Sequence, residues 1–242
     1  MQDNSKRGLR TIFWLKASIA VTAVMGVLAF FVAKFNYEQF QGAADVTAVP
    51  GFTNFIVLLL FSVLVALVWS IAASMGSVYW ALWIFRSEEN LRKFTRTGFS
   101  PWGAVFCTLF LTFVPVVGAI LDYLIFKDLL DSHEKVLSAK GVEFAPVPRR
   151  LLKTVLVMYL LCTISWFLPS LGGSVFILST AVGIACVVFV IKLVGGVMAY
   201  EKQLFEFDQE EVLRKKVDEV LREREIEKAA AAIQASPPDS PN

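Results

Sequence analysis

The sequence predicts an all-α integral membrane protein, and three observations support this prediction. Of the 242 residues, 56% are hydrophobic and 18% are charged, whereas soluble domains carry about 25% charged residues. The apolar residues form long blocks without charge, and a helix of about 20 such residues crosses the ~30 Å hydrocarbon core of a bilayer. After residue 200 the composition becomes charged with helical spacing. We expect four transmembrane helices, a proline-broken hairpin that does not cross, and a cytoplasmic C-terminal helix.

The first span is expected at residues 11–33, after a polar and basic N-terminus at residues 1–10. Lys16 can extend its amino group to the headgroups while its stem stays in the apolar region. The apolar run is longer than the h-region of a signal peptide, and no A-x-A cleavage pattern follows it. We therefore interpret the run as a retained span.

The second span is expected at residues 52–85, which carry no charge. As one helix this segment is ~50 Å long, more than the bilayer needs. Its end, with Trp80 and Trp83, is therefore expected at the interface, where Trp is enriched. Small residues recur in this helix at spacings that let helix backbones approach closely, either within the chain or in a dimer. They are Ser70, Ala72, Ala73, Ser74, Gly76 and Ser77.

The third apolar block, residues 102–126, is interrupted by Pro115 and Gly118. An interior proline bends or breaks a helix, and each half of the block is too short to span comfortably. We expect a non-crossing hairpin at about residues 102–130, either re-entrant or a dip followed by an interfacial helix. Its irregular backbone must then be buried against protein.

The last two spans are expected at residues 154–168 and 171–198, joined by the short segment P-S-L-G-G. A link of this length joins antiparallel neighbours. The membrane domain as a whole would then cover residues 11–200.

Positive charges set the orientation, because Lys and Arg concentrate in cytoplasmic loops. Lys6, Arg7 and Arg10 place the N-terminus in the cytoplasm, and only Lys34 lies in the next connection. If the third block crossed the membrane, six basic residues would lie outside. They are Lys127, Lys135, Lys140, Arg149, Arg150 and Lys153. A hairpin that returns to its own side keeps all six inside, with both termini cytoplasmic.

The tail is expected to form an exposed charged helix at residues 201–228. Acidic residues precede basic ones by four positions three times, as in Glu211 and Lys215, which supports a helix. Leu213, Val217 and Leu221 form a narrow apolar stripe. The stripe is too short for a firm coiled-coil assignment, so a solvated or self-docked helix and intermolecular pairing both stay open. Residues 229–242, rich in Pro and Ser at their end, are expected to be disordered.

No motif in the sequence indicates an enzyme or a cofactor. His133 is the single histidine and lies near Asp128, Asp131 and Glu134, but their spacing matches no zinc or calcium pattern. We therefore expect no metal and a solvated helix end. Cys107, Cys162 and Cys186 lie in apolar stretches, where thiols act as small hydrophobes. A net charge of +2 argues against binding of nucleic acid.

Asp122 and Lys192 are candidate functional residues, because ionisable groups at membrane depth are costly. Lys192 lies near the inner end of its helix, where its side chain can reach the headgroups. Asp122 lies beside the expected break. A pair between them would anchor the hairpin or form part of a solute or proton route.

Several short motifs give the chain a family resemblance. Trp83, Arg86 and Asn90 stand in W-I-F-R-S-E-E-N, Pro101 and Trp102 in F-S-P-W, and Pro115 in F-V-P. In order and spacing these segments resemble a bacterial membrane family, the domain of unknown function 4328, over roughly residues 56–203. After Pro115 the chain departs from the family pattern. The resemblance implies a multi-pass helical module of the bacterial inner membrane and supplies no activity.

The leading functional hypothesis is a non-enzymatic membrane component that acts by interaction, as a scaffold or regulator. Its contacts would be the lipid bilayer and either a second copy or a partner protein on the cytoplasmic face and tail. The alternative is a small oligomeric channel or transporter component in which residues 113–122 line a cavity, as broken helices do in transporters.

Overall fold

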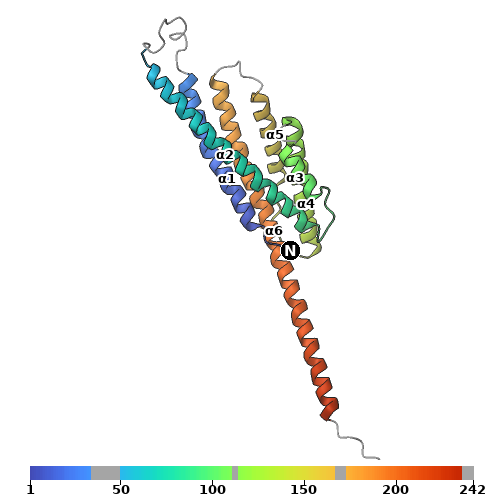
Figure 1. The fold of residues 1–242 in the computed structure, drawn as a ribbon. Coiled ribbons are helices and arrows are strands. Elements are labelled where there is room, and N and C mark those ends of the chain that lie inside the picture. Colours follow the sequence, from blue (N-terminus) through green and yellow to red (C-terminus); the bar gives the residue numbers. More distant parts are fainter. Residues whose placement is uncertain (34–49, 111–113, 167–172, 236–242) are drawn as a thin grey trace, which may run out of the picture.

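The computed structural model describes residues 1–33, 50–110, 114–166 and 173–235. Within these residues all regular secondary structure is helical, as predicted, and Figure 1 labels the helices. They are α1 (Ser5–Ala33), α2 (Phe52–Leu91), α3 (Pro101–Phe110), α4 (Pro115–Ala139), α5 (Arg149–Trp166) and α6 (Gly173–Ala235).

Three of these helices, α1, α2 and α6, are long and apolar enough to cross a membrane. Their apolar side chains face outward: Val57, Leu60 and Leu67 on α2 are each more than half exposed. In water such a surface would be costly, whereas in lipid it is well solvated. The described part of α5 has 18 residues and begins with Arg149, Arg150 and Lys153, so α5 as a whole is not among the helices that qualify. These charges precede the span expected at residues 154–168. The end of the span expected there, residues 167–168, lies outside the described residues.

The helices pack in chain order into a closed ring. Each one contacts the next, and α6 returns to contact α1, while α4 also touches α2 and α6 across the ring. In Figure 1, α1 and α2 run side by side at the left, α6 follows, and α5 with α3 and α4 lies at the right. At the contact of α1 with α2, a Cβ on Gly76 would lie 3.7 Å from the Cβ of Trp14. At this position the small residue serves packing within the chain.

Helices α3 and α4 lie against each other. The backbone N–H groups of Gly98 and Phe99, just before α3, donate to the carboxylate of Asp128 in α4 at 2.8 and 3.3 Å. The start of α3 therefore lies beside the middle of α4. Pro115 is the first residue of α4, a position where its missing N–H breaks no helical hydrogen bond. Helix α4 runs on to Ala139, beyond the end expected at residue 130.

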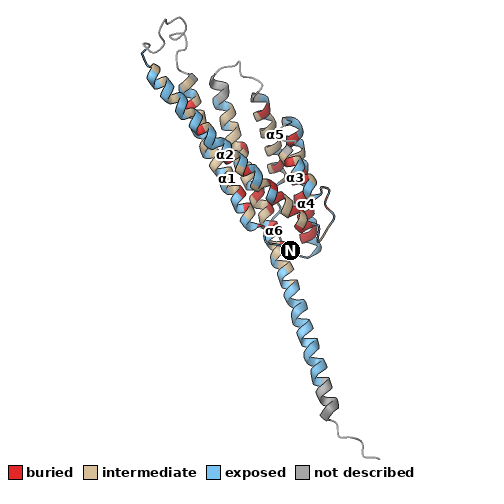
Figure 2. Cartoon of the chain, viewed as in Figure 1, coloured by how far each residue is buried: buried red, intermediate tan, exposed pale blue. Residues whose placement is uncertain are grey.

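The packed core lies at one end of the ring. Its fully buried side chains come mainly from the last turns of α2, the middle and end of α4 and the middle of α6, where Figure 2 shows the buried residues gathered. They include Trp83, Ile84, Leu91, Ile125, Leu129, Leu130, Leu137, Leu193, Val197 and Leu204. We call this end of the molecule the closed end.

Helix α6 is continuous over 63 residues, a length of ~95 Å at 1.5 Å per residue. It runs from the ring into the charged tail without a break and projects beyond the closed end (Figure 1). The helix also covers residues 229–235, which we expected to be disordered. Ala229 to Ala232 follow Glu227 and Lys228, and all are strong helix formers. Residues 236–242 lie outside the described part of the chain.

Candidate functional site

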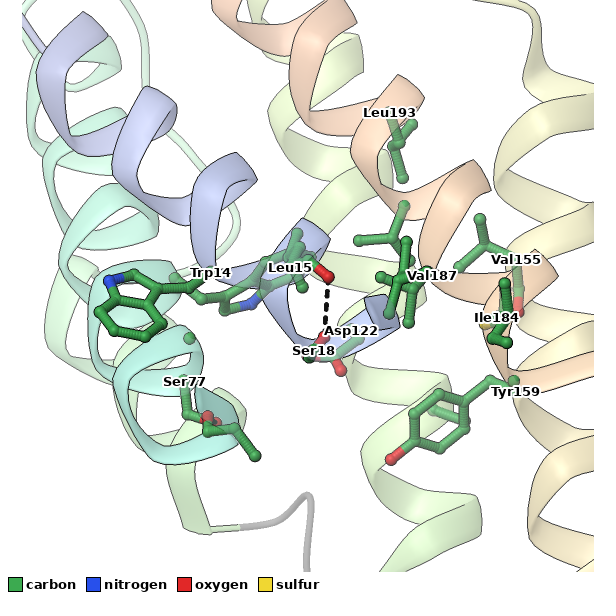
Figure 3. Close-up of a pocket in the computed structure, with 18 of the residues that line it drawn as sticks. Trp14, Leu15, Ser18, Ser77, Asp122, Val155, Tyr159, Ile184, Val187 and Leu193 are labelled. Atoms are coloured by element: carbon green, nitrogen blue, oxygen red, sulfur yellow. Dashed lines mark hydrogen bonds between the residues drawn. The ribbon is translucent and has the colours of Figure 1, made fainter. Parts of the chain in front are cut away.

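A cavity of ≈ 570 Å³ lies within the ring and is lined by residues of all six helices. Its walls are mostly apolar and aromatic. Figure 3 shows Trp14 on the α1 side, Asp122 near the centre and Tyr159 opposite, with its hydroxyl extending into the cavity. No Lys, Arg or His is among the described residues that line it. The one group there with a full formal charge is the carboxyl of Asp122.

One side of this cavity borders the packed core. Trp80, Phe126, Leu152 and Leu193 line it and also belong to the core or pack against it, so these side chains separate the cavity from the closed end. Trp69, farther along α2, is 39% exposed. The cavity therefore borders the core toward the closed end, and farther along α2 it reaches an exposed side chain.

The serine and threonine hydroxyl groups in the walls form hydrogen bonds within the protein. Ser18 donates to the carbonyl of Leu15 at 2.8 Å (Figure 3), and Ser77 donates to the carbonyl of Ala73 at 3.0 Å. The indole N–H of Trp69 donates to Thr22 at 3.1 Å and links α2 to α1. These bonds leave the hydroxyl oxygens as acceptors toward the cavity.

Asp122 and Lys192, our candidate membrane residues, do not pair. Among the ion pairs of the described residues none joins them. Lys192 is exposed, and its amino group lies 5.6 Å from the ring centre of Phe189. Helical geometry explains why the pair does not form. Val190 and Leu193 line the cavity, so the side chain of Lys192 on the same helix points away from it. The polar anchor considered from the sequence is absent.

The helix break contributes less to the cavity than expected. Gly118 is buried in the first turn of α4, where its N–H donates to the carbonyl of Val114 at 2.8 Å. Of the described residues in 113–122, only Ala119 and Asp122 line the cavity. Residues 111–113 lie outside the described part.

A second polar site lies at the closed end around Glu201, and sequence reasoning missed it. The carboxylate of Glu201 is 5% exposed and accepts hydrogen bonds from Ser87 at 2.6 Å, Asn4 at 3.0 Å and the indole N–H of Trp83 at 3.2 Å. We call these four residues the Glu201 junction. It joins the start of the chain, α2 and α6 without a cation.

Neighbouring contacts reinforce the same junction. Asn90 accepts from the backbone N–H of Gln2 at 3.1 Å and donates to its carbonyl at 2.9 Å. The amino group of Met1 pairs with Asp208 of α6. The first residues are thus held between α2 and α6.

The histidine is buried, which corrects the solvated helix end that we expected. His133 has no exposed surface, and its Nδ1 lies 2.7 Å from the carbonyl of Leu129. Burial lowers the pKa of its imidazole from 6.5 to about 4. Arg149 pairs with Asp131 and Glu134 at 2.6 and 2.7 Å. Among the described residues no group of His, Cys and acidic side chains is arranged to hold a metal.

The residues of the family-like motifs lie in different structural environments. Trp83 is fully buried in the Glu201 junction, so it is not the interfacial tryptophan that we expected. Arg86 pairs with Glu89 on its own helix. Pro101 begins α3, and the exposed Trp102 stacks edge-to-face on Phe85 at 5.0 Å.

The apolar stripe of the tail is not docked on the protein. Leu213, Val217 and Leu221 are 63, 49 and 54% exposed, and Val220 is exposed beside them. Upstream, Glu211 binds Lys215 at 3.0 Å and Lys140 at 3.3 Å. The tail is therefore tied to the ring at residue 211 and stands apart from it beyond that point.

Comparisons with protein-family models, with curated proteins and with solved structures found no match. The resemblance to the domain of unknown function 4328 therefore stays a prediction.

Proposed function

We propose that the protein is a non-enzymatic multi-pass membrane component that acts by interaction, as a scaffold or regulator. The observation that carries this proposal is α6, a single helix that passes from the apolar ring into an exposed tail with an uncovered apolar stripe. A continuous helix transmits position between the membrane and a cytoplasmic partner more directly than a jointed linker does. The tail together with the basic segments at residues 86–96 and 127–153 forms the contact face.

The stripe is the recognition element, since an amphipathic helix binds through apolar positions spaced three and four residues apart. The test replaces Leu213, Val217 and Leu221 by Ser. The matched control replaces Lys215, Glu219 and Arg222 by Ser, which changes the opposite face of the same helix with the same cost in helix propensity.

Native mass spectrometry of the gently solubilised protein reads out the result. The wild type and the control should carry a second copy or a partner chain, and the stripe variant should lose it. If all three proteins bind the same chains, or none, the stripe is not the interaction element.

The proposed topology has four spans (α1, α2, α5 and α6), a non-crossing α3–α4 hairpin and both termini in the cytoplasm of a bacterium, with the protein in its inner membrane. It is supported by the six basic residues between 127 and 153. A variant with Lys140→Cys in a cysteine-free background tests it. In intact cells an impermeant thiol reagent should not label this position. Labelling from outside the cell would show that the segment crosses the membrane, which contradicts the proposed hairpin.

A second candidate function is a small oligomeric channel or transporter component, which the ring cavity favours. One carboxyl at membrane depth is a typical element of a solute or proton path. In this case Asp122→Asn should abolish flux in reconstituted vesicles. The stripe variant should retain flux.

A further inference from the structure

We propose that the ring cavity is a binding site for a lipophilic organic cation, a molecule with an apolar body and one positive charge. The cavity combines apolar aromatic walls with a single acidic group. This inference deepens the second candidate function, and its assay is binding, so that it can fail or succeed apart from flux.

The size and walls of the cavity fit an apolar body of drug size. Its volume, ≈ 570 Å³, lies within the ~300–1,000 Å³ of small-molecule sites. Trp14, Trp80, Tyr123, Phe126 and Tyr159 contribute aromatic rings to its lining. Aromatic faces attract cations that have lost their hydration shell, so these walls suit a charged ligand as well as its apolar part.

The carboxyl of Asp122 favours a ligand with a positive charge. No hydrogen bond or ion pair from another described side chain reaches its carboxyl, and no basic residue among the described residues lines the cavity. An anion would meet the carboxylate without a compensating cation, and a neutral apolar ligand would leave the carboxyl without a partner. A cation provides the missing charge.

Access favours a ligand that dissolves in the bilayer. Trp80, Phe126 and Leu193 join the cavity wall to the packed core, while Trp69 at its other side is partly exposed. The outer faces of α1 and α2 are apolar. A lipophilic cation accumulates in such surroundings, whereas a small hydrated cation does not.

The experiment measures binding of radiolabelled tetraphenylphosphonium to the full-length protein in detergent by equilibrium dialysis. We expect about one cation bound per chain, and at least about tenfold weaker binding in Asp122→Asn, since removing one partner of a desolvated charge pair raises the off-rate strongly. The matched control is Asp131→Asn, which removes the same charge from the same helix outside the cavity. It should bind as the wild type does.

A second variant tests the location without touching a charge. A Cβ added at Gly183, which lines the cavity, meets its nearest neighbour, the Sγ atom of Cys162, at 3.9 Å. Gly183→Leu therefore adds side-chain volume at the cavity wall without a clash at its Cβ. It should reduce binding at least about fivefold by occupying part of the ligand's volume.

Four results overturn the proposal: equal binding by wild type and Asp122→Asn, equal loss in Asp131→Asn, unchanged binding in Gly183→Leu, or equally effective competition by the neutral triphenylphosphine oxide. Flux is a separate measurement. Binding without flux would keep this site and remove the transport function, and flux without this binding would do the reverse.

Discussion

Among the carboxyl groups of the described residues, Glu201 at the closed end and Asp122 in the cavity are surrounded by the protein in opposite ways. Glu201 accepts hydrogen bonds from Asn4, Trp83 and Ser87. Asp122 shares its cavity with aromatic rings and with Ser18 and Ser77, whose hydroxyls already donate to their own helices. Only the first carboxyl has its acceptor capacity filled by the protein.

This difference separates a structural acid from an acid available to a ligand. Removing a buried acceptor leaves its donors unpaired, at about 1–3 kcal/mol for each. Removing an acid without donors has no such cost. Substitutions at the two positions should therefore have unequal effects on stability.

Glu201→Leu should give the largest loss, about 3–5 kcal/mol, because the donors of Asn4, Trp83 and Ser87 lose their shared acceptor. Thermal unfolding in detergent, followed by tryptophan fluorescence, measures the change. Glu206→Leu is the matched control. Glu206 lies on the same helix, exposed, 3.7 Å from Lys202, and its loss should cost less than about 1 kcal/mol. Equal effects in the two variants would mean that the junction is not structural.

Acid should destabilise the protein through His133. Its pKa in the folded state is about 4, below the ordinary 6.5, so the unfolded chain binds the proton more tightly. Stability is unaffected above pH 6.5 and falls as the pH decreases toward 4, by about 3 kcal/mol at pH 4.

The His133→Gln variant isolates this contribution. The other titrating groups are common to both proteins, so the difference between their unfolding profiles reports the imidazole alone. The wild type should lose more stability than the variant between pH 6.5 and 4. Parallel profiles would show that His133 takes up its proton as easily when folded as when unfolded.

Asn4→Ala should have an intermediate effect, about 1–2 kcal/mol. The amide of Asn4 donates to the carbonyl of Trp83 at 3.1 Å and to Glu201 at 3.0 Å. A double-mutant cycle with Glu201→Leu measures their coupling. If the two losses simply add, Asn4 acts on α2 alone and does not belong to the junction.

The sequence predicted those features that depend on residues close together in the chain. Long charge-free blocks predicted the positions of α1, α2 and α6, since apolar length alone decides whether a helix suits a bilayer. The break near Pro115 was also visible, because proline acts on its own helix. Asp122 stood out as a lone acid among apolar residues.

Contacts between distant segments could not be predicted in this way. Glu201 follows the last apolar block, where a carboxylate normally begins a solvated tail, and its partner Asn4 lies 197 positions earlier. Nothing near Glu201 in the sequence indicates that these donors converge. His133 was misjudged for the same reason: its acidic neighbours indicate a solvated helix face, but α6 covers the imidazole with Tyr200 at 6.2 Å between ring centres.

Asp122→Leu should have the smallest effect, within about 1 kcal/mol of the wild type, because no described side chain donates a hydrogen bond to its carboxyl and leucine adds apolar contact to the cavity wall. The same unfolding assay checks this, and a ligand then sharpens the contrast. Tetraphenylphosphonium at ten times its Kd should stabilise the wild type by about 1.4 kcal/mol, and Asp122→Leu by no more than about 0.4 kcal/mol, because loss of the carboxyl weakens binding at least about tenfold. A loss at residue 122 as large as that at residue 201 would show that Asp122 has a partner in the protein, and the distinction between the two acids would disappear.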